Sequence, residues 1–174
     1  MIKPTLKLFD RCMQGELIRF TEGGQTHWAL VGDRGRGRLM LLVLPLNSPP
    51  YCQNILNEIL SDADEMDILR PPYEGTPLLS YGKDYSIRVD HAGDCNVGGS
   101  GAVMRSPGAY VMTDEDNFIC CRDDRVATKT AYFDLKTGAV RGQPGGLRAV
   151  FAAWDLALTA EPPTTLLRVQ ASNP

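Results

Sequence analysis

The chain has 174 residues, a length that suits one domain built around one hydrophobic core. Its formal net charge of −3 and sequence pI of about 5.4 disfavour a chain-wide attraction to nucleic acid or to anionic membranes. The longest apolar run, Leu39–Leu46, is too short to span a bilayer, and no apolar segment follows the charged residues near Met1. We therefore expect no membrane association.

The cysteines bear on the cellular compartment. They are five in number, an odd set, and they include no C-x-x-C pair: Cys12, Cys52, Cys95, Cys120 and Cys121. Secreted disulfide frameworks usually contain an even set, so we expect reduced thiols and a cytoplasmic location in a bacterial-type cell.

The stretch from Glu16 to Leu46 predicts three consecutive strands, at Glu16–Thr21, His27–Gly32 and Arg38–Leu44. Both connections contain glycine, which adopts the positive φ that tight turns need. The third strand is apolar at every position from Leu39 to Leu44, whereas a strand exposed on one face would alternate. We expect it to be covered on both faces and central to the core.

Two segments of the first half carry helical signals. Residues 5–14 predict a short helix that ends near Gly15, although Leu6 and Leu8 also fit a strand. Ser48 and Pro49 are typical of a helix start, and the next apolar residues follow one helical face: Cys52, Ile55, Leu56, Ile59 and Leu60. A second short helical turn is expected over Asp62–Leu69.

The second half predicts mostly short strands separated by tight turns, among them the polar turn Asp114–Asn117 and the turn Lys136-Thr137-Gly138. A half-buried strand is expected at Tyr85–His91, followed by a glycine-rich loop at Gly93–Gly101 and then by four strands: Ala102–Arg105, Ala109–Thr113, Phe118–Arg122 and Thr128–Leu135. Residues 147–158 fit both a helix and a strand, and their alanines favour the helix. A last edge strand is expected at Thr165–Gln170.

These elements predict an α+β fold, mostly antiparallel sheet with two or three short helices, in which the N-terminal three-stranded meander joins a larger antiparallel sheet. We expect residues 1–174 to form a single domain. Within it, the Pro/Gly-rich segment 71–82 would join two sub-lobes, residues 1–70 and residues 83–170.

The loop around Cys95 is one candidate for catalysis. A nucleophilic cysteine needs a nearby base, and His91 and His27 are the only histidines. Gly93-Asp94-Cys95 resembles the Gly-x-Cys-Gly-Gly elbow of chymotrypsin-like cysteine proteases, except that Asn96-Val97 intervene before the glycines. The resemblance implies a cysteine-dependent hydrolase, with His27, Asp62 or Asp64, and Cys95 in that family's chain order. The simpler interpretation is a packed histidine and an inert loop thiol.

Two surfaces are candidates for ligand binding. Arg34, Arg36 and Arg38 place three guanidinium groups at one hairpin tip, with Trp28 and Tyr51 as stacking partners for a nucleic acid. The simpler interpretation is a solvated turn. The other surface is the glycine-rich loop, whose polar and glycine residues could cradle a phosphate: Asn96, Gly98, Gly99 and Ser100. That loop lacks the Gly-Lys-Ser/Thr ending of a P-loop, so a flexible connection is the simpler interpretation.

The sequence favours a non-enzymatic binding or accessory protein, because two histidines, no paired-carboxylate motif and no cofactor fingerprint leave little material for chemistry. A cysteine-dependent hydrolase and a nucleic-acid-binding module are the alternatives. We expect no cofactor and no metal, since the cysteines lack zinc spacing and Asp62–Glu65 lacks the pattern of an EF-hand loop. The acidic residues Asp114, Glu115 and Asp116 are expected to be solvated turn charges that could face a basic partner.

Overall fold

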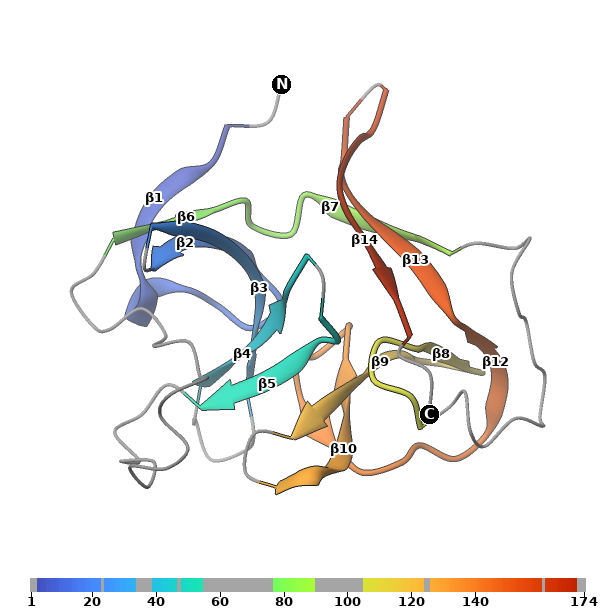
Figure 1. Cartoon of the computed structure of the whole chain (residues 1–174). Helices are drawn as coiled ribbons and strands as arrows, with labels where there is room; N and C mark the ends of the chain where they lie inside the picture. Colours follow the sequence, from blue (N-terminus) through green and yellow to red (C-terminus); the bar gives the residue numbers. More distant parts are fainter. Residues whose placement is uncertain are drawn as a thin grey trace.

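The computed structural model of the chain describes residues 3–22, 24–33, 39–46, 48–54, 77–89, 105–123, 126–160 and 162–171. Within these ranges the regular secondary structure is almost entirely β-strand (Figure 1), with a single 3₁₀ turn, η1 (Phe9–Arg11). The described residues contain no α-helix, so the α+β prediction is wrong. Six strands lie before or just after the undescribed segment 55–76: β1 (Thr5–Leu8), β2 (Leu17–Glu22), β3 (Gln25–Asp33), β4 (Leu39–Leu44), β5 (Tyr51–Asn54) and β6 (Pro77–Ser80).

Eight further strands follow β6, and their connections are mostly short. They are β7 (Tyr85–Val89), β8 (Tyr110–Thr113), β9 (Asn117–Asp123), β10 (Val126–Asp134), β11 (Val140–Arg141), β12 (Leu147–Phe151), β13 (Ala153–Leu158) and β14 (Thr164–Gln170).

The strands form two sheets. The large sheet has the order β1-β6-β2-β3-β4-β5-β9-β10-β11, and β8 joins it by pairing with both β9 and β12. The small sheet has the order β14-β13-β7. All pairings between named strands are antiparallel except that of β5 with β9, which is parallel, so the large sheet is mixed rather than purely antiparallel.

The predicted N-terminal meander is confirmed, because β2 pairs with β3 and β3 pairs with β4 in antiparallel register. β4 is also buried on both faces. Met40, Leu42 and Leu44 belong to one apolar cluster, whereas Leu41 and Val43 belong to another on the opposite face of the sheet. The expectation of a doubly covered central strand is therefore confirmed.

The large sheet curls until β3 meets the turn before β11. An isolated parallel bridge joins Asp33 to Ala139, and the Asp33 N–H donates to the carbonyl oxygen of Gly138 at 2.8 Å. Gly32 permits this approach, because a Cβ there would lie 2.5 Å from the ring of Phe133 and 2.7 Å from the Gly138 oxygen. This closure brings the N-terminal meander against the C-terminal half of the chain.

The small sheet packs its apolar face onto the large one. Trp154 and Leu156 of β13 share a buried cluster with Leu17, Leu30 and other residues of the meander. The Trp154 indole N–H donates to the Gly108 carbonyl at 2.8 Å, so this fully buried ring has its polar atom satisfied.

The predicted helix at 147–158 is wrong, because this segment forms β12 and β13 with a break at Ala152. Residues 153–158 form a strand because β13 lies between β7 and β14, which pair with its backbone N–H and C=O groups on both sides.

The predicted helix at 5–14 is wrong as well. Its first residues form β1, which pairs with β6. The only helical turn among the residues predicted to be helical is the 3₁₀ turn η1. The helix expected after Ser48 is replaced at its start by β5, where Cys52 pairs with Leu42. The rest of that prediction, together with the turn at Asp62–Leu69, lies outside the described residues.

Candidate functional site

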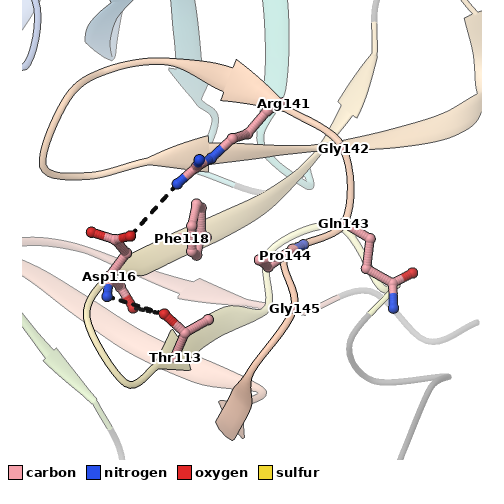
Figure 2. A pocket seen from close by; sticks show the side chains of 8 residues that line it. All are labelled: Thr113, Asp116, Phe118, Arg141, Gly142, Gln143, Pro144 and Gly145. Atoms are coloured by element: carbon pink, nitrogen blue, oxygen red, sulfur yellow. Dashed lines mark hydrogen bonds and ion pairs between the residues drawn. The ribbon is translucent and has the colours of Figure 1, made fainter.

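A cavity of about 460 Å³ opens between the β8–β9 turn, β11 and the loop that leads to β12 (Figure 2). We call it the Arg141 pocket. Eight residues line it: Thr113, Asp116, Phe118, Arg141, Gly142, Gln143, Pro144 and Gly145. Figure 2 shows the Arg141 side chain reaching from β11 toward Asp116, with the Phe118 ring beside it.

The β8–β9 turn is held by Thr113. Its hydroxyl accepts the backbone N–H of Asp116 at 3.0 Å and donates to the Asp116 carbonyl at 3.1 Å. The Thr113 N–H donates to the same carbonyl at 2.9 Å. Such side-chain to backbone bonds are typical of threonine in turns. The Thr113 hydroxyl therefore stabilises the β8–β9 turn, and this turn places the Asp116 carboxylate at the rim of the pocket.

Arg141 is the central side chain of the pocket. Its Nη2 lies 2.9 Å from Oδ2 of Asp134 and 3.6 Å from Oδ2 of Asp116. Its guanidinium lies over the Phe118 ring, 4.9 Å from the centroid, a cation–π contact. Asp134 and Phe118 hold the guanidinium in place, yet the Arg141 side chain is still 51% exposed and reaches solvent.

Asp134 anchors the guanidinium from the end of β10. Its side chain is only 3% exposed. Oδ1 accepts the backbone N–H groups of Lys136 and Thr137, at 2.9 and 3.3 Å, and Oδ2 accepts from Arg141. The turn ends at Gly138, which has a φ of +76° and follows the predicted Lys136-Thr137-Gly138 pattern. One buried carboxylate thus fixes both the turn and the arginine.

The charge near the pocket does not favour an anion. The only cation in its lining is Arg141, which already faces two carboxylates. The neighbouring turn adds Asp114, whose carboxylate lies 3.8 Å from Arg148 with both side chains largely exposed. A phosphate would therefore enter a region whose positive charge is balanced by acidic groups.

A second polar cluster surrounds Glu16. The Glu16 carboxylate accepts from the Lys7 ammonium at 2.7 Å, from the Ser80 hydroxyl at 3.1 Å and from the backbone N–H of Met13. Burial alone would raise the pKa of Glu16, but these hydrogen bonds outweigh it and lower that pKa below its ordinary value. We call these four residues the Glu16 cluster.

The histidine and tryptophan singled out by sequence lie on opposite faces of β3. The His27 ring packs on Phe20, with centroids 5.4 Å apart, and its Nε2 is buried without a hydrogen-bond partner among the described residues. The ring centroids of Trp28 and Tyr81 lie 5.3 Å apart, and Cζ of Arg19 lies 5.6 Å from the Trp28 ring centroid. Within the described ranges, the arginine that stacks on Trp28 is Arg19.

The other sequence-predicted site residues lie outside the described part of the chain. These are the hairpin arginines, the candidate nucleophile and its neighbouring histidine, and the glycine-loop residues: Arg34, Arg36, Arg38, Cys95, His91, Asn96, Gly98, Gly99 and Ser100. The hydrolase and nucleic-acid hypotheses that depend on them stay predictions.

The sequence interpretation missed the Arg141 pocket. The expected polar turn at Asp114–Asn117 is present, and two of its acidic side chains face a basic partner within the chain, Arg141 for Asp116 and Arg148 for Asp114. The spacing of Thr113 and Asp116 was the local signal for this turn. No local pattern marked Arg141, because its partners come from β10 and the β8–β9 turn.

Comparison with protein-family models, with curated proteins and with solved structures finds no match for this chain. Among the described residues, no helix is long and apolar enough to cross a membrane. Nor does that part of the chain contain a group of three or more His, Cys, Asp or Glu side chains placed to hold a metal ion.

Proposed function

We propose that this chain is a non-enzymatic binding protein that takes a small, uncharged polar ligand in the Arg141 pocket. The observation that carries this proposal is the gap of 3.6 Å between Nη2 of Arg141 and Oδ2 of Asp116. This distance is too long for a direct hydrogen bond, so a donor and an acceptor stand side by side with unused capacity. A carboxamide or a hydroxyl, which both donates and accepts, matches that pair.

The surroundings of the gap support a neutral ligand. Arg141 makes no hydrogen bond other than that to Asp134 within the described residues, so further donors of its guanidinium are available to a ligand. The acidic turn disfavours phosphates and polyanions. The Thr113 hydroxyl is engaged in its turn, which supports binding rather than nucleophilic chemistry at this pocket.

The compartment belongs to the same proposal. We place the protein in the cytosol of a bacterial-type cell, and the absence of a disulfide among the four described cysteines supports this location.

The test is a titration of the full chain, ¹⁵N-labelled, with acetamide, glycerol and inorganic phosphate, followed through backbone amide signals. We expect acetamide or glycerol to shift the signals of Asp116, Gly142 and Gly145, and phosphate to leave them unchanged. Asp116→Asn should abolish these shifts. The matched control is Arg148→Gln, because Arg148 is exposed, pairs with an acidic residue of the same turn and lies outside the lining.

Two results would overturn the proposal. One is a response to phosphate that exceeds the response to both neutral probes. The other is an equal response to acetamide and glycerol in wild type and Asp116→Asn, which would show that these probes do not use the Arg141–Asp116 pair.

A further inference from the structure

Two buried thiols meet where the two halves of the large sheet join. Cys52 of β5 and Cys121 of β9 have their Sγ atoms 2.8 Å apart, and both residues are fully buried. They are 69 positions apart in sequence. Neither thiol belongs to the Arg141 pocket or to the Glu16 cluster, so their contact needs an explanation of its own.

The strands that carry these thiols form a short seam. β5 and β9 pair in parallel over only two positions, Tyr51 with Arg122 and Cys52 with Asp123. The Arg122 N–H adds one hydrogen bond to the Pro50 carbonyl at 3.0 Å. In the sheet order this seam lies between β4, which ends the meander, and the C-terminal strands. A covalent link here would join the two halves of the sheet.

The orientation of the two thiols favours a bond between them. The Cys121 thiol donates weakly to the Ala131 carbonyl, with the sulfur 3.5 Å from the oxygen, and so directs its lone pairs elsewhere. Its sulfur can then accept from the Cys52 thiol. A disulfide has an S–S length of roughly 2.0 Å, so side-chain movements of less than about 1 Å would close the pair.

The adjacent Cys120 provides a contrast within the same strand. Successive side chains of a strand point to opposite faces, and Cys120 accordingly lies in a different apolar cluster, with Tyr132. Burial raises the pKa of its thiol to about 12. The Cys120 side chain therefore points to the other face of β9 from Cys121, and its thiol is a poor thiolate at neutral pH.

We propose that Cys52 and Cys121 form a reversible disulfide, a redox-sensitive clamp across the β5–β9 seam. A hydroperoxide oxidises one thiol to a sulfenic acid and is itself reduced to water or an alcohol. The second thiol attacks that sulfur, the S–O bond breaks, and the hydroxyl leaves as a second molecule of water. Two thiols and one hydroperoxide thus give one disulfide, and a dithiol reductant reverses the step.

Burial sets the rate of this reaction. Both sulfurs are shielded, so a peroxide reaches them only when the seam opens locally. We expect slow oxidation of the native protein and faster oxidation in mild urea. Once formed, the bond closes a long loop in the unfolded chain, which should raise the folding equilibrium constant on the order of 100-fold.

The experiment treats the full chain with hydrogen peroxide, blocks the remaining thiols with N-ethylmaleimide and maps tryptic peptides without reduction. Trypsin releases Cys52 on one peptide and Cys120 with Cys121 on another. We expect one cross-linked pair, with fragmentation between Cys120 and Cys121 assigning the bond to Cys121. The urea midpoint should rise on oxidation and return after dithiothreitol.

Variants sharpen this result. Cys121→Ala should lose the cross-link, while Cys120→Ala, the matched control from the next position of the same strand, should keep it. The wild-type map decides the question by itself if a variant fails to fold. A map without the Cys52–Cys121 pair, or with Cys120 linked as often as Cys121, would overturn the assignment. An unchanged urea midpoint in the linked protein would overturn the clamp.

Discussion

The Glu16 cluster and the Arg141 pocket each contain an ion pair between a buried carboxylate and a more exposed cation. In each, a nearly buried carboxylate holds a cation that reaches solvent: Glu16 and Asp134 are 7% and 3% exposed, while Lys7 and Arg141 are 31% and 51% exposed. Each carboxylate also accepts backbone N–H groups beside it. The two sites differ in what surrounds the cation.

At Glu16 the carboxylate accepts from the Lys7 ammonium, the Ser80 hydroxyl and the Met13 N–H, and the bond from Lys7 ties the edge strand β1 to the residue that precedes β2. At Arg141 a second carboxylate, Asp116, stands 3.6 Å away beside an open cavity. Under the proposed function, the pair of Arg141 and Asp116 binds a ligand because its hydrogen-bonding capacity is not used within the protein.

The largest effect is expected from Glu16→Ala. The change leaves a buried hydroxyl and a backbone N–H without their acceptor, which should lower the free energy of unfolding by about 2–3 kcal/mol. Urea denaturation measures it. The matched control is Asp155→Ala, which removes a more exposed pair with Arg168 and should cost less than about 1 kcal/mol. Equal losses in the two variants would contradict the view of the Glu16 cluster as a fastener.

A smaller loss is expected from removing the cation of each site. Arg141→Met leaves the Asp134 carboxylate buried with only two N–H donors, and should cost about 2 kcal/mol, less than for fully buried pairs because Arg141 reaches solvent. Lys7→Met should cost only about 1 kcal/mol, since two other donors still serve Glu16. Urea midpoints compare the two variants, and the reverse order would be inconsistent with this account.

Acid should weaken the Glu16 cluster. The pKa of Glu16 is lower in the folded protein than its ordinary value of 4.5, so the folded state binds fewer protons than the unfolded state in that range. Its contribution to stability is complete above pH 4.5 and is lost as the pH falls through the folded-state pKa. Urea denaturation across the acid range should show this slope in wild type. In Glu16→Gln, which cannot titrate, the slope should be shallower, and an identical slope would assign the effect to other carboxylates.

The parts of the fold that sequence reasoning predicted correctly depend on local signals. The run from Leu39 to Leu44 is apolar at every position, so its burial on both faces followed directly from composition. The glycine-bearing connection between β2 and β3 likewise marked a turn, and Gly24 there has a φ of +77°. These signals do not depend on which distant strand pairs with which.

The errors arose where two periodicities fitted the same residues. Val150, Trp154 and Leu158 lie on one helical face, but Trp154 and Leu156 also alternate with Asp155, as a strand requires. Pairing with β7 and β14 selected the strand. The capping signal at Ser48 was overridden in the same way, because β4 offered a partner to β5.

The Arg141 pocket could not be predicted from sequence, because its residues meet only through long-range pairing. Arg141 reaches Asp134 because β10 and β11 pair, and reaches Phe118 because β9 and β10 pair. The turn at Asp114–Asn117 was predictable, and so was the turn that ends at Gly138, but their approach to one arginine was not.

The smallest effect on stability, and the sharpest test of the comparison, is expected from Asp116→Asn. Its carboxylate is 27% exposed and stands beyond hydrogen-bond distance from Arg141, so the free energy of unfolding should change by no more than about 0.5 kcal/mol. The response to acetamide or glycerol should nevertheless be lost. A variant that spares stability while removing binding would show that the Arg141–Asp116 gap recognises a ligand. If Asp116→Asn instead costs as much as Arg141→Met, Asp116 supports the fold, and the pocket is a second fastener like the Glu16 cluster.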